Sequence, residues 1–192
     1  RRGRGWSHED VAFAGSWVIH DHGSITNPGL LQLQGGLALH EAINATCISE
    51  ERTVLKWPND SLLHVGEELR KVGGVLVEST SRGKSTRAIL GIGCNISSDK
   101  LHKEDYSLAA LEEVKGDISL PRFETAIQAS VASWFERKKG VDEVKRKAFL
   151  AHYSTVLKST VKLLGEPIYR SKKMSFQAIE NSGKMTLQDE EM

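Results

Sequence analysis

The sequence predicts an α+β fold, with helices packed on a β-sheet and a small β module after them. Apolar runs of strand length lie at Val11–Ile19 and Arg87–Ile96. Apolar residues recur at three- and four-residue spacing in Leu30–Ala45 and Pro121–Lys138, which is the pattern of amphipathic helices. Short strand-like runs joined by glycine turns follow in the C-terminal part of the sequence. A length of 192 residues suits one main domain with a small appendix.

Composition excludes several classes of protein. Hydrophobic residues make up 39% and charged residues 27%, which is typical of a folded domain rather than a disordered or fibrous chain. Lys and Arg number 26 against 25 Asp and Glu, so net charge gives no reason to expect a nucleic acid or a membrane surface as partner. No apolar run reaches the roughly 18–20 residues that cross a bilayer. Cys47 and Cys94 are too few for a disulfide framework, and we expect reduced thiols in a cytoplasmic protein.

The first half of the chain predicts a strand, a turn and a helix. Val11–Ile19 is mostly apolar and is followed by turn-forming residues, so we expect a buried strand. Asn27–Gly29 predicts a turn, because proline disfavours helix at the residue before it. In the helix that follows, Leu30–Ala45, Gly35 and Gly36 each cost about 1 kcal/mol against alanine. We therefore expect that this helix packs closely against a sheet at its glycine pair.

Three further strands are predicted in the middle of the chain. Arg52–Trp57 has strand character and ends at Pro58. Val75–Glu78 and Arg87–Ile96 are separated by turn residues at 81–84, which predicts a hairpin-like pair in the same sheet.

Helices are expected to follow. Ser107–Lys115 predicts a short helix with Ser107 as its N-cap and Gly116 as its end. Pro121–Lys138 has the clearest helical pattern in the chain, and Val141–Leu157 predicts a third long helix.

The pattern changes near residues 154–159. Thr160–Leu164, Met174–Ile179 and Met185–Gln188 predict short strands, which would form part of a small β-barrel. We therefore expect a main domain over residues 1–155 and a second module over residues 156–192.

The first of four chemically suggestive clusters is the segment Arg1–Ser7. Arg1 and Arg4 alternate with glycines, which gives a mobile backbone with bidentate phosphate donors. Trp6 beside them offers a flat face on which a base could stack. A flexible basic segment without function explains the same residues, and taken alone this cluster favours that simpler interpretation.

The second cluster is Lys56-Trp57-Pro58-Asn59-Asp60, at the end of a predicted strand. Strand ends at the edge of a sheet are common places for ligand-binding groups. Lys56 could offset phosphate charge, and Asp60 could hold a Mg²⁺ ion that keeps most of its waters. A strand end with a side-chain-bonded turn at Asn59 and Asp60 is an equally good explanation of the residue types.

The third cluster begins with Lys71, which is followed closely by Gly73 and Gly74. A lysine beside glycine backbone N–H groups can stabilise an anion or a developing oxyanion. A tight turn with a solvated lysine is the alternative interpretation.

The fourth cluster is Gly91-Ile92-Gly93-Cys94-Asn95-Ile96. Glycines within a strand permit close approach of a ligand to the backbone. Asn95 carries both a donor and an acceptor and could therefore bind the edge of a nucleobase. Cys94, with apolar neighbours, is interpreted as a core residue rather than a nucleophile.

Together these clusters resemble the biotin protein ligases. The arginine-glycine loop of that family resembles RRGRGW at residues 1–6, and its KWPND motif is unaltered at residues 56–60. Its two glycine strands resemble KVGGVLVE at residues 71–78 and GIGCNI at residues 91–96, in the same order. The resemblance implies a catalytic domain with a mixed sheet, followed by a small SH3-like β-barrel. It also implies that biotin and ATP form biotinyl-AMP, from which biotin passes to a lysine on the biotin carrier domain of a carboxylase.

The resemblance also implies roles for individual residues. Arg1 and Arg4 would close over the adenylate, and Lys71 would contact the biotin carboxylate and the phosphate. Gly73, Gly74 and Gly93 would approach biotin and phosphate. The nucleotide would be bound by Arg4, Trp6, Ser7, Lys56, Asn59 and Asn95. Asp60 would serve Mg²⁺ or the attacking lysine.

Two other functions stay open at this stage, as does the quaternary structure. A lipoate ligase or octanoyltransferase has a related fold, but the unaltered KWPND motif argues against it. An inactive fragment that binds only a nucleotide or a carrier domain is the second alternative. The N-terminal segment of the family, which holds the biotin ring, is not in the sequence, and we expect a piece truncated at both ends. A homodimer is compatible with the resemblance, and we expect neither a membrane nor a nucleic acid as partner.

Overall fold

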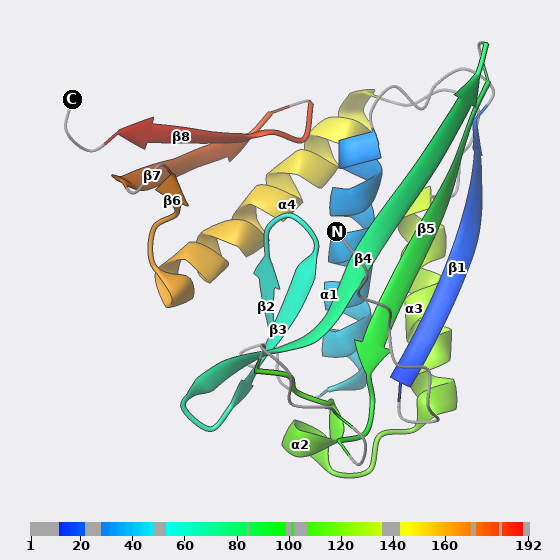
Figure 1. Ribbon diagram of the computed structural model, residues 1–192, viewed down its shortest axis with the longest axis vertical. Coiled ribbons are helices and arrows are strands. Elements are labelled where there is room, and N and C mark those ends of the chain that lie inside the picture. Colours follow the sequence, from blue (N-terminus) through cyan, green and yellow to red (C-terminus); the bar gives the residue numbers. More distant parts are fainter. Residues whose placement is uncertain are drawn as a thin grey trace.

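The protein is described by a computed structural model that covers residues 12–21, 28–47, 53–83, 85–98, 101, 107–135, 143–169, 172–180 and 182–189. A five-stranded sheet and a separate three-stranded sheet are joined through helices (Figure 1). In chain order the elements are β1 (Ala12–Asp21), α1 (Pro28–Thr46), β2 (Thr53–Lys56), β3 (Asp60–Val65), β4 (Glu68–Arg82), β5 (Ser85–Asn95), α2 (Glu112–Lys115), α3 (Leu120–Phe135), α4 (Glu143–Leu164), β6 (Ile168–Tyr169), β7 (Lys172–Ile179) and β8 (Met185–Asp189).

The five-stranded sheet has the strand order β1-β5-β4-β3-β2, and each neighbouring pair is antiparallel. The predicted mixed sheet is therefore wrong for the described strands. Short connections join β2 to β3, β3 to β4 and β4 to β5, and a chain that turns back at once can only pair antiparallel. The sequence prediction missed β3 and began β4 too late, at Val75 rather than Glu68.

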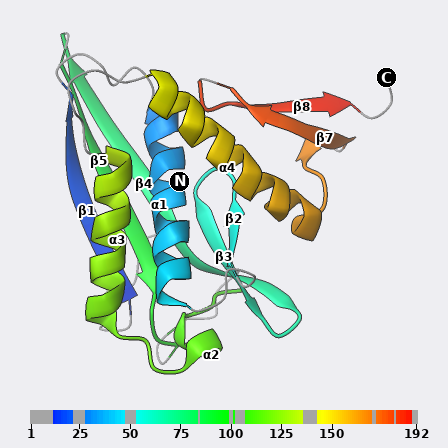
Figure 2. The ribbon, with the colours of Figure 1, turned by 180° about the vertical axis from the view of Figure 1, so that it is seen from behind.

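Helices α1 and α3 cover one face of this sheet, as the view from behind shows (Figure 2). The chain enters α1 at Pro28, inside the predicted turn, because proline fits the first turn of a helix. Helix α1 is buried on more than one side. Leu39 and Ile43 belong to the core between α1, α3 and the sheet, whereas Leu33 and Leu37 belong to a second core against α4. This position explains why α1 is more apolar than a surface helix.

The glycine pair in α1 fits the predicted close packing. A Cβ atom on Gly35 would lie 2.6 Å from Leu90 Cδ1 and 2.9 Å from Val75 Cγ1, both on the sheet. A Cβ atom on Gly36 would lie 3.5 Å from Leu55 Cδ1, an ordinary contact. Of the two, only Gly35 is thus required to be glycine by the approach of the sheet.

Two predicted elements are wrong. Only Glu112–Lys115 is helical in the segment predicted as a helix from Ser107, and Ser107 is not an N-cap. Its carbonyl instead accepts a hydrogen bond from the Lys71 amide at 2.9 Å. Thr160–Leu164 is the last turn of α4 rather than a strand, since the Thr160 hydroxyl donates to the Leu55 carbonyl at 2.8 Å and ties this turn to β2.

The C-terminal strands β6, β7 and β8 form a three-stranded antiparallel sheet. Phe176 and Ile179 of β7 are buried in the same core as Phe149 and Tyr153 of α4, so this sheet packs on the helix. Helix α4 passes through residues 155 and 156 without a break. The SH3-like barrel and the division between residues 155 and 156 stay predictions.

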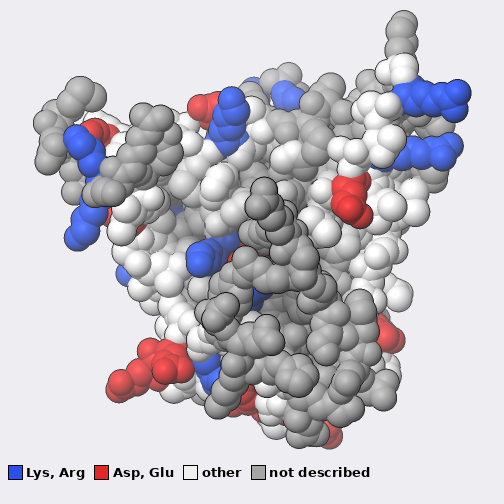
Figure 3. Space-filling view, viewed as in Figure 1, with Lys and Arg blue, Asp and Glu red and all other residues white. Residues whose placement is uncertain are grey.

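The described surface carries charges of both signs (Figure 3). Figure 3 shows Lys and Arg interspersed with Asp and Glu over the face seen in Figure 1, without a single dominant patch among the described residues. None of the described helices combines the length and the apolar character needed to cross a lipid bilayer.

The glycine pair gives a matched test of this packing. Gly35→Ala and Gly36→Ala gain the same helix propensity, but only the first inserts a methyl group into a filled contact. We predict that Gly35→Ala is less stable than Gly36→Ala by about 1–3 kcal/mol. Urea unfolding of both variants measures the difference, and equal stabilities would contradict the close packing of α1 on β4 and β5.

Candidate functional site

The face of the sheet that α1 and α3 leave uncovered carries a floor of small residues. Side chains alternate between the two faces of a strand, and the residues beside these positions, such as Phe13, Trp17 and Ile92, pack toward the helices. The floor, as we call it below, consists of Ala14 and Ser16 of β1, Gly74 of β4, and Gly91 and Gly93 of β5. Gly93 pairs with both Gly74 and Ala14, and Gly91 pairs with Ser16. A flat ligand could therefore lie directly against the backbone here.

Sequence reasoning identified the glycines of this floor but missed Ala14 and Ser16. The signal was present in the small residues at every second position, Ala12, Ala14 and Ser16, although Gly15 between them is small as well. Small residues at alternate positions leave one face of a strand with little side chain, but only the pairing with β5 shows what lies beside it.

An ion pair stands at one end of the floor. Lys71 Nζ lies 2.6 Å from Asp60 Oδ1, and the two side chains are 28% and 20% exposed. Gly74 is directly beside them, because a Cβ atom there would lie 3.0 Å from Asp60 Oδ1 and 3.3 Å from Lys71 Nζ. The second and third clusters of the sequence thus meet here through the pairing of β3 with β4. The ammonium is partly solvent-accessible and can exchange Asp60 for an anionic ligand.

Asn59 has a structural role in this arrangement. Its side chain is buried, and Nδ2 donates to the Val75 carbonyl at 2.7 Å, while its own carbonyl accepts from the Val75 amide at 2.9 Å. These bonds hold the start of β3 against β4 and so place Asp60. Lys56, the last residue of β2, is exposed, and Trp57 beside it is 38% exposed.

Asn95 ends β5 in a buried position. Its Nδ2 donates to the Ala109 carbonyl at 3.0 Å, and its carbonyl accepts from the Leu111 amide at 3.1 Å. The Ala109 amide in turn donates to the Lys71 carbonyl at 2.8 Å. Lys71 and Asn95 are therefore both attached to one segment, residues 107–111.

The remaining predicted site residues fall in different places. Gly73 faces the helical layer, where a Cβ atom would lie 3.1 Å from Leu39 Cδ2 and 2.7 Å from the Gly93 carbonyl oxygen, so packing explains this glycine. Its predicted contact with a ligand stays a prediction. Arg1, Arg4, Trp6 and Ser7 lie outside the described residues.

Cys94 is a core residue. It is fully buried, and burial together with neighbouring Cys47 raises the pKa of its thiol well above the ordinary value. A thiol of this kind stays protonated and is a poor nucleophile.

No cluster of three or more His, Cys, Asp or Glu side chains that could hold a metal occurs within the described ranges. Asp60 is the carboxylate at the floor. One carboxylate together with substrate phosphates is a ligand set that Mg²⁺ accepts, so Asp60 fits a metal that arrives with a nucleotide rather than a resident one.

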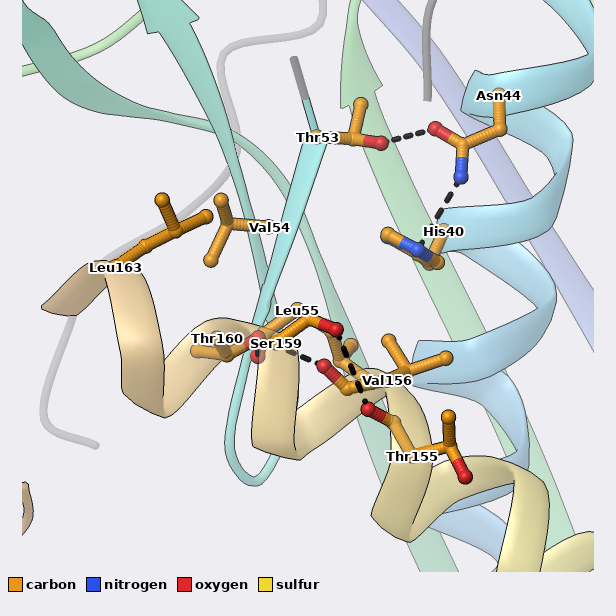
Figure 4. Close-up of a pocket in the computed structure, with 10 residues that line it drawn as sticks. All are labelled: His40, Asn44, Thr53, Val54, Leu55, Thr155, Val156, Ser159, Thr160 and Leu163. Carbon is orange, nitrogen blue, oxygen red and sulfur yellow. Dashed lines mark hydrogen bonds between the residues drawn. The ribbon is translucent and has the colours of Figure 1, made fainter. Parts of the chain in front are cut away.

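A cavity of about 200 Å³ lies away from the floor, between α1, β2 and α4 (Figure 4). It is lined by His40, Asn44, Thr53, Val54, Leu55, Thr155, Val156, Ser159, Thr160 and Leu163. No charged group lines it, and the hydroxyls of Thr155, Ser159 and Thr160 donate to main-chain carbonyls. It therefore lacks the converging polar groups of a ligand site, and Lys71 and Asp60 do not line it.

His40 is the buried titratable group of this cavity. Asn44 Nδ2 lies 3.2 Å from His40 Nε2, and Asn44 Oδ1 accepts from the Thr53 hydroxyl. Burial, followed by the nearby His152, lowers the pKa of His40 to about 4. The imidazole is therefore neutral at pH 7 and supports the junction of α1 with β2.

Comparison with known proteins supplies the family. The family model described as the biotin/lipoate A/B protein ligase family matches residues 1–95, which include all four clusters up to Asn95. Over these residues the chain is similar to this family. The resemblance drawn from the motifs is thus confirmed.

A curated relative of the ligase family is the biotin–[acetyl-CoA-carboxylase] ligase of Paracoccus denitrificans. It is 38% identical over 98 residues, which are 50% of this chain and 39% of the relative. The chain thus matches about two-fifths of the length of this curated relative.

Solved structures support the ligase fold. A biotin protein ligase-like protein of unknown function from Silicibacter sp. aligns with a TM-score of 0.70 and 14% identity, over 94% of this chain and 76% of that one. The biotin protein ligase of Aquifex aeolicus, in complex with biotin and ATP, aligns with a TM-score of 0.68 and 22% identity, over 100% of this chain and 77% of that one. At these identities the likeness establishes the α+β ligase fold.

His40 gives a pH-dependent prediction. Because its pKa is about 4 in the folded protein and about 6.5 in the unfolded chain, the unfolded chain alone takes up the proton between these values. The stability is therefore complete above pH 6.5 and falls as the pH drops toward 4, by about 3 kcal/mol from this group. We predict that His40→Gln loses less stability between pH 7 and pH 4 than the wild type does. Urea unfolding at both pH values measures this, and parallel losses would contradict the assignment.

Proposed function

We propose that this protein is an ATP-dependent biotin ligase. It would join biotin to a lysine on the biotin carrier domain of a carboxylase through biotinyl-AMP. The observation that carries the proposal is the Lys71–Asp60 pair at the end of a bare sheet floor. Support comes from the family, from the relative named for biotin and acetyl-CoA carboxylase, and from the fold of a ligase solved with biotin and ATP.

The first half-reaction must bring two anions together. An oxygen of the biotin carboxylate attacks the α-phosphorus of ATP, the bond from that phosphorus to the bridging oxygen breaks, and diphosphate leaves. The Lys71 ammonium, which exchanges Asp60 for these ligands, would lower their repulsion and stabilise the charge that develops at phosphorus. Arg1 and Arg4 would add bidentate donors to the same anions.

The floor would hold the uncharged parts of the substrates. Gly74 and Gly93, with Gly73 behind them, would let biotin and phosphate approach the backbone. Asn95 has its amide plane fixed by Ala109, which suits it to bind the edge of adenine.

The other nucleotide contacts would come from the first two clusters. Trp6 would stack on adenine, and Ser7 would hydrogen-bond it. Lys56 and Asn59 would lie on the nucleotide side of Asp60. The charge of Lys56 would attract the phosphates, and Asn59 would act by holding β3 in place.

Asp60 is the residue that would hold Mg²⁺ bound to the ATP phosphates. When bound, the ion neutralises phosphate charge. In the second half-reaction, the carrier lysine loses a proton to solvent and its neutral amine attacks the acyl carbon of biotinyl-AMP. The bond from that carbon to the phosphate oxygen breaks, AMP leaves, and the nitrogen loses a second proton to solvent as the amide forms. Asp60 would attract that lysine, because its carboxylate can accept a hydrogen bond from the incoming ammonium. We further propose a cytoplasmic location, in keeping with reduced Cys47 and Cys94.

Replacement of Lys71 tests the proposal. Lys71→Ala should slow biotin-dependent exchange of diphosphate into ATP about 10²-fold or more, the scale for removal of one electrostatic donor. Lys71→Arg should restore only part of the rate, since a guanidinium presents its charge with a different geometry. The assay uses the full-length protein, and thermal melting controls for folding.

Lys158→Ala is the matched control, because Lys158 is exposed on α4. The Lys71–Asp60 pair is partly exposed, so its loss should change the stability by no more than about 1 kcal/mol. Exchange at the wild-type rate in Lys71→Ala, with an unchanged melting temperature, would remove Lys71 from the reaction and sink the proposal.

A further inference from the structure

One segment connects the two strands that carry the proposed reaction. β5 ends at Asn95, and residues 107–111 run beside Lys71 of β4. Leu108 forms a parallel β-bridge with Lys71. The Lys71 amide donates to the Ser107 carbonyl, and its carbonyl accepts from the Ala109 amide. Ala109 also accepts from the Asn95 side chain. A shift of this segment would therefore move the backbone of Lys71 and the amide of Asn95 together.

An ion pair holds this segment from outside. Arg70 Nη2 lies 2.5 Å from Glu113 Oε2, and Arg70 Nη1 donates to the Leu108 carbonyl at 3.1 Å. The other oxygen of Glu113, Oε1, accepts from the Ala110 amide at 2.8 Å. The pair thus hydrogen-bonds the segment at two points: Arg70 of β4 binds Leu108, and Glu113 of α2 binds Ala110.

The geometry is that of a strong contact. The side chains of Arg70 and Glu113 are 17% and 21% exposed, while Glu113 as a whole residue lies at the surface, so solvent screens their charges only in part. Arginine bonds Glu113 and the Leu108 carbonyl at once, a fork that lysine cannot reproduce. Glu68, 74% exposed, lies 3.7 Å from Arg70 Nε and adds a weaker partner.

The segment does not need this pair in order to stay folded. Ala109, Ala110 and Leu111 are fully buried, and Ala109 and Leu111 belong to the main core. Burial of these side chains anchors the segment, whereas the ion pair fixes where its backbone lies along β4. Loss of the pair should therefore disturb position more than stability.

We propose that Arg70 and Glu113 are positioning residues of the adenylate-forming site. They set Lys71 and Asn95 in register with each other by fixing residues 107–111 between β4 and α2. This inference rests on the proposed function. Neither residue belongs to the four sequence clusters, and both act through residues that would touch the substrates.

The experiment compares Arg70→Gln, Glu113→Gln, the double variant and Arg70→Lys in the full-length protein. Biotin-dependent diphosphate exchange gives KM for ATP and kcat for each. Each single change should reduce kcat/KM about 10- to 100-fold, the scale for a misplacement of about 1 Å in a reacting site. The kcat/KM of the double variant should fall no further than that of the worse single variant, because either change breaks the same ion pair. Arg70→Lys should fail to restore activity.

Two controls separate position from stability and from the proposed function. Lys172→Gln removes a distant ion pair with Asp189 and should leave both kinetic constants unchanged. Lys71→Ala reports on the proposed function itself. If exchange depends on Lys71 but the Arg70 and Glu113 variants keep wild-type KM and kcat, this inference alone is overturned. A lowered melting temperature with unchanged constants would also overturn it, and absence of exchange in the wild type would overturn both.

Discussion

Among the described elements, helices cover the five-stranded sheet on one face only, and the rest of the structure follows from that constraint. Alternate residues of β1, β4 and β5 must be apolar to meet α1 and α3, while the residues between them are free to be small. The close approach of α1 at Gly35 and of Leu39 to Gly73 makes the helical side dense. The opposite side can then present backbone at its glycines, although Val18, Leu76 and Ile89 are exposed on the same face.

Charge is added to this surface by residues of the strands themselves, Asp60 of β3 and Lys71 of β4. The pairing of β3 with β4 brings Asp60 to Gly74, next to Lys71, and the short fixed bonds of Asn59 keep β3 in that register. Residues 107–111 do the same for Lys71 and Asn95 from the other side. A group that must meet two anions is thus held by the sheet itself. Preorganised charge of this type needs little rearrangement during a reaction.

Strongly periodic elements could be predicted from the sequence. The strand at Val11–Ile19 and the helix at Pro121–Lys138 correspond closely in position to β1 and α3. The expectation of a buried strand is wrong for β1, because β1 lies at the edge of the sheet and exposes Ala14, Ser16 and Val18. Elements whose partners lie far away in sequence could not. The Ser107–Lys115 run has helical spacing, yet hydrogen bonds to Lys71 and Asn95 draw residues 107–111 into an extended segment. The residues of the short run Thr160–Leu164 are compatible with a strand or a helix. In the structure they continue α4, and the Thr160 hydroxyl donates a hydrogen bond to the Leu55 carbonyl.

The site was predictable as a set of residue types but not as an arrangement. Motifs identified Lys71, Gly74 and Asp60, and the structure brings them within contact of one another. The motifs did not predict that Gly73 faces the helices, or that the Asn59 side-chain amide donates a hydrogen bond to the Val75 carbonyl. Arg70 and Glu113 carry no motif at all, because their partners are main-chain groups of Leu108 and Ala110.

The central claim is that the floor and Lys71 form an acyl-adenylate of biotin. The most direct measurement incubates the full-length protein with ATP, Mg²⁺ and either biotin or lipoate, without an acceptor protein, and identifies the product by mass spectrometry. We expect biotinyl-AMP that requires ATP and is lost in Lys71→Ala. Lipoyl-AMP in the absence of biotinyl-AMP, or no adenylate with either acid, would contradict it.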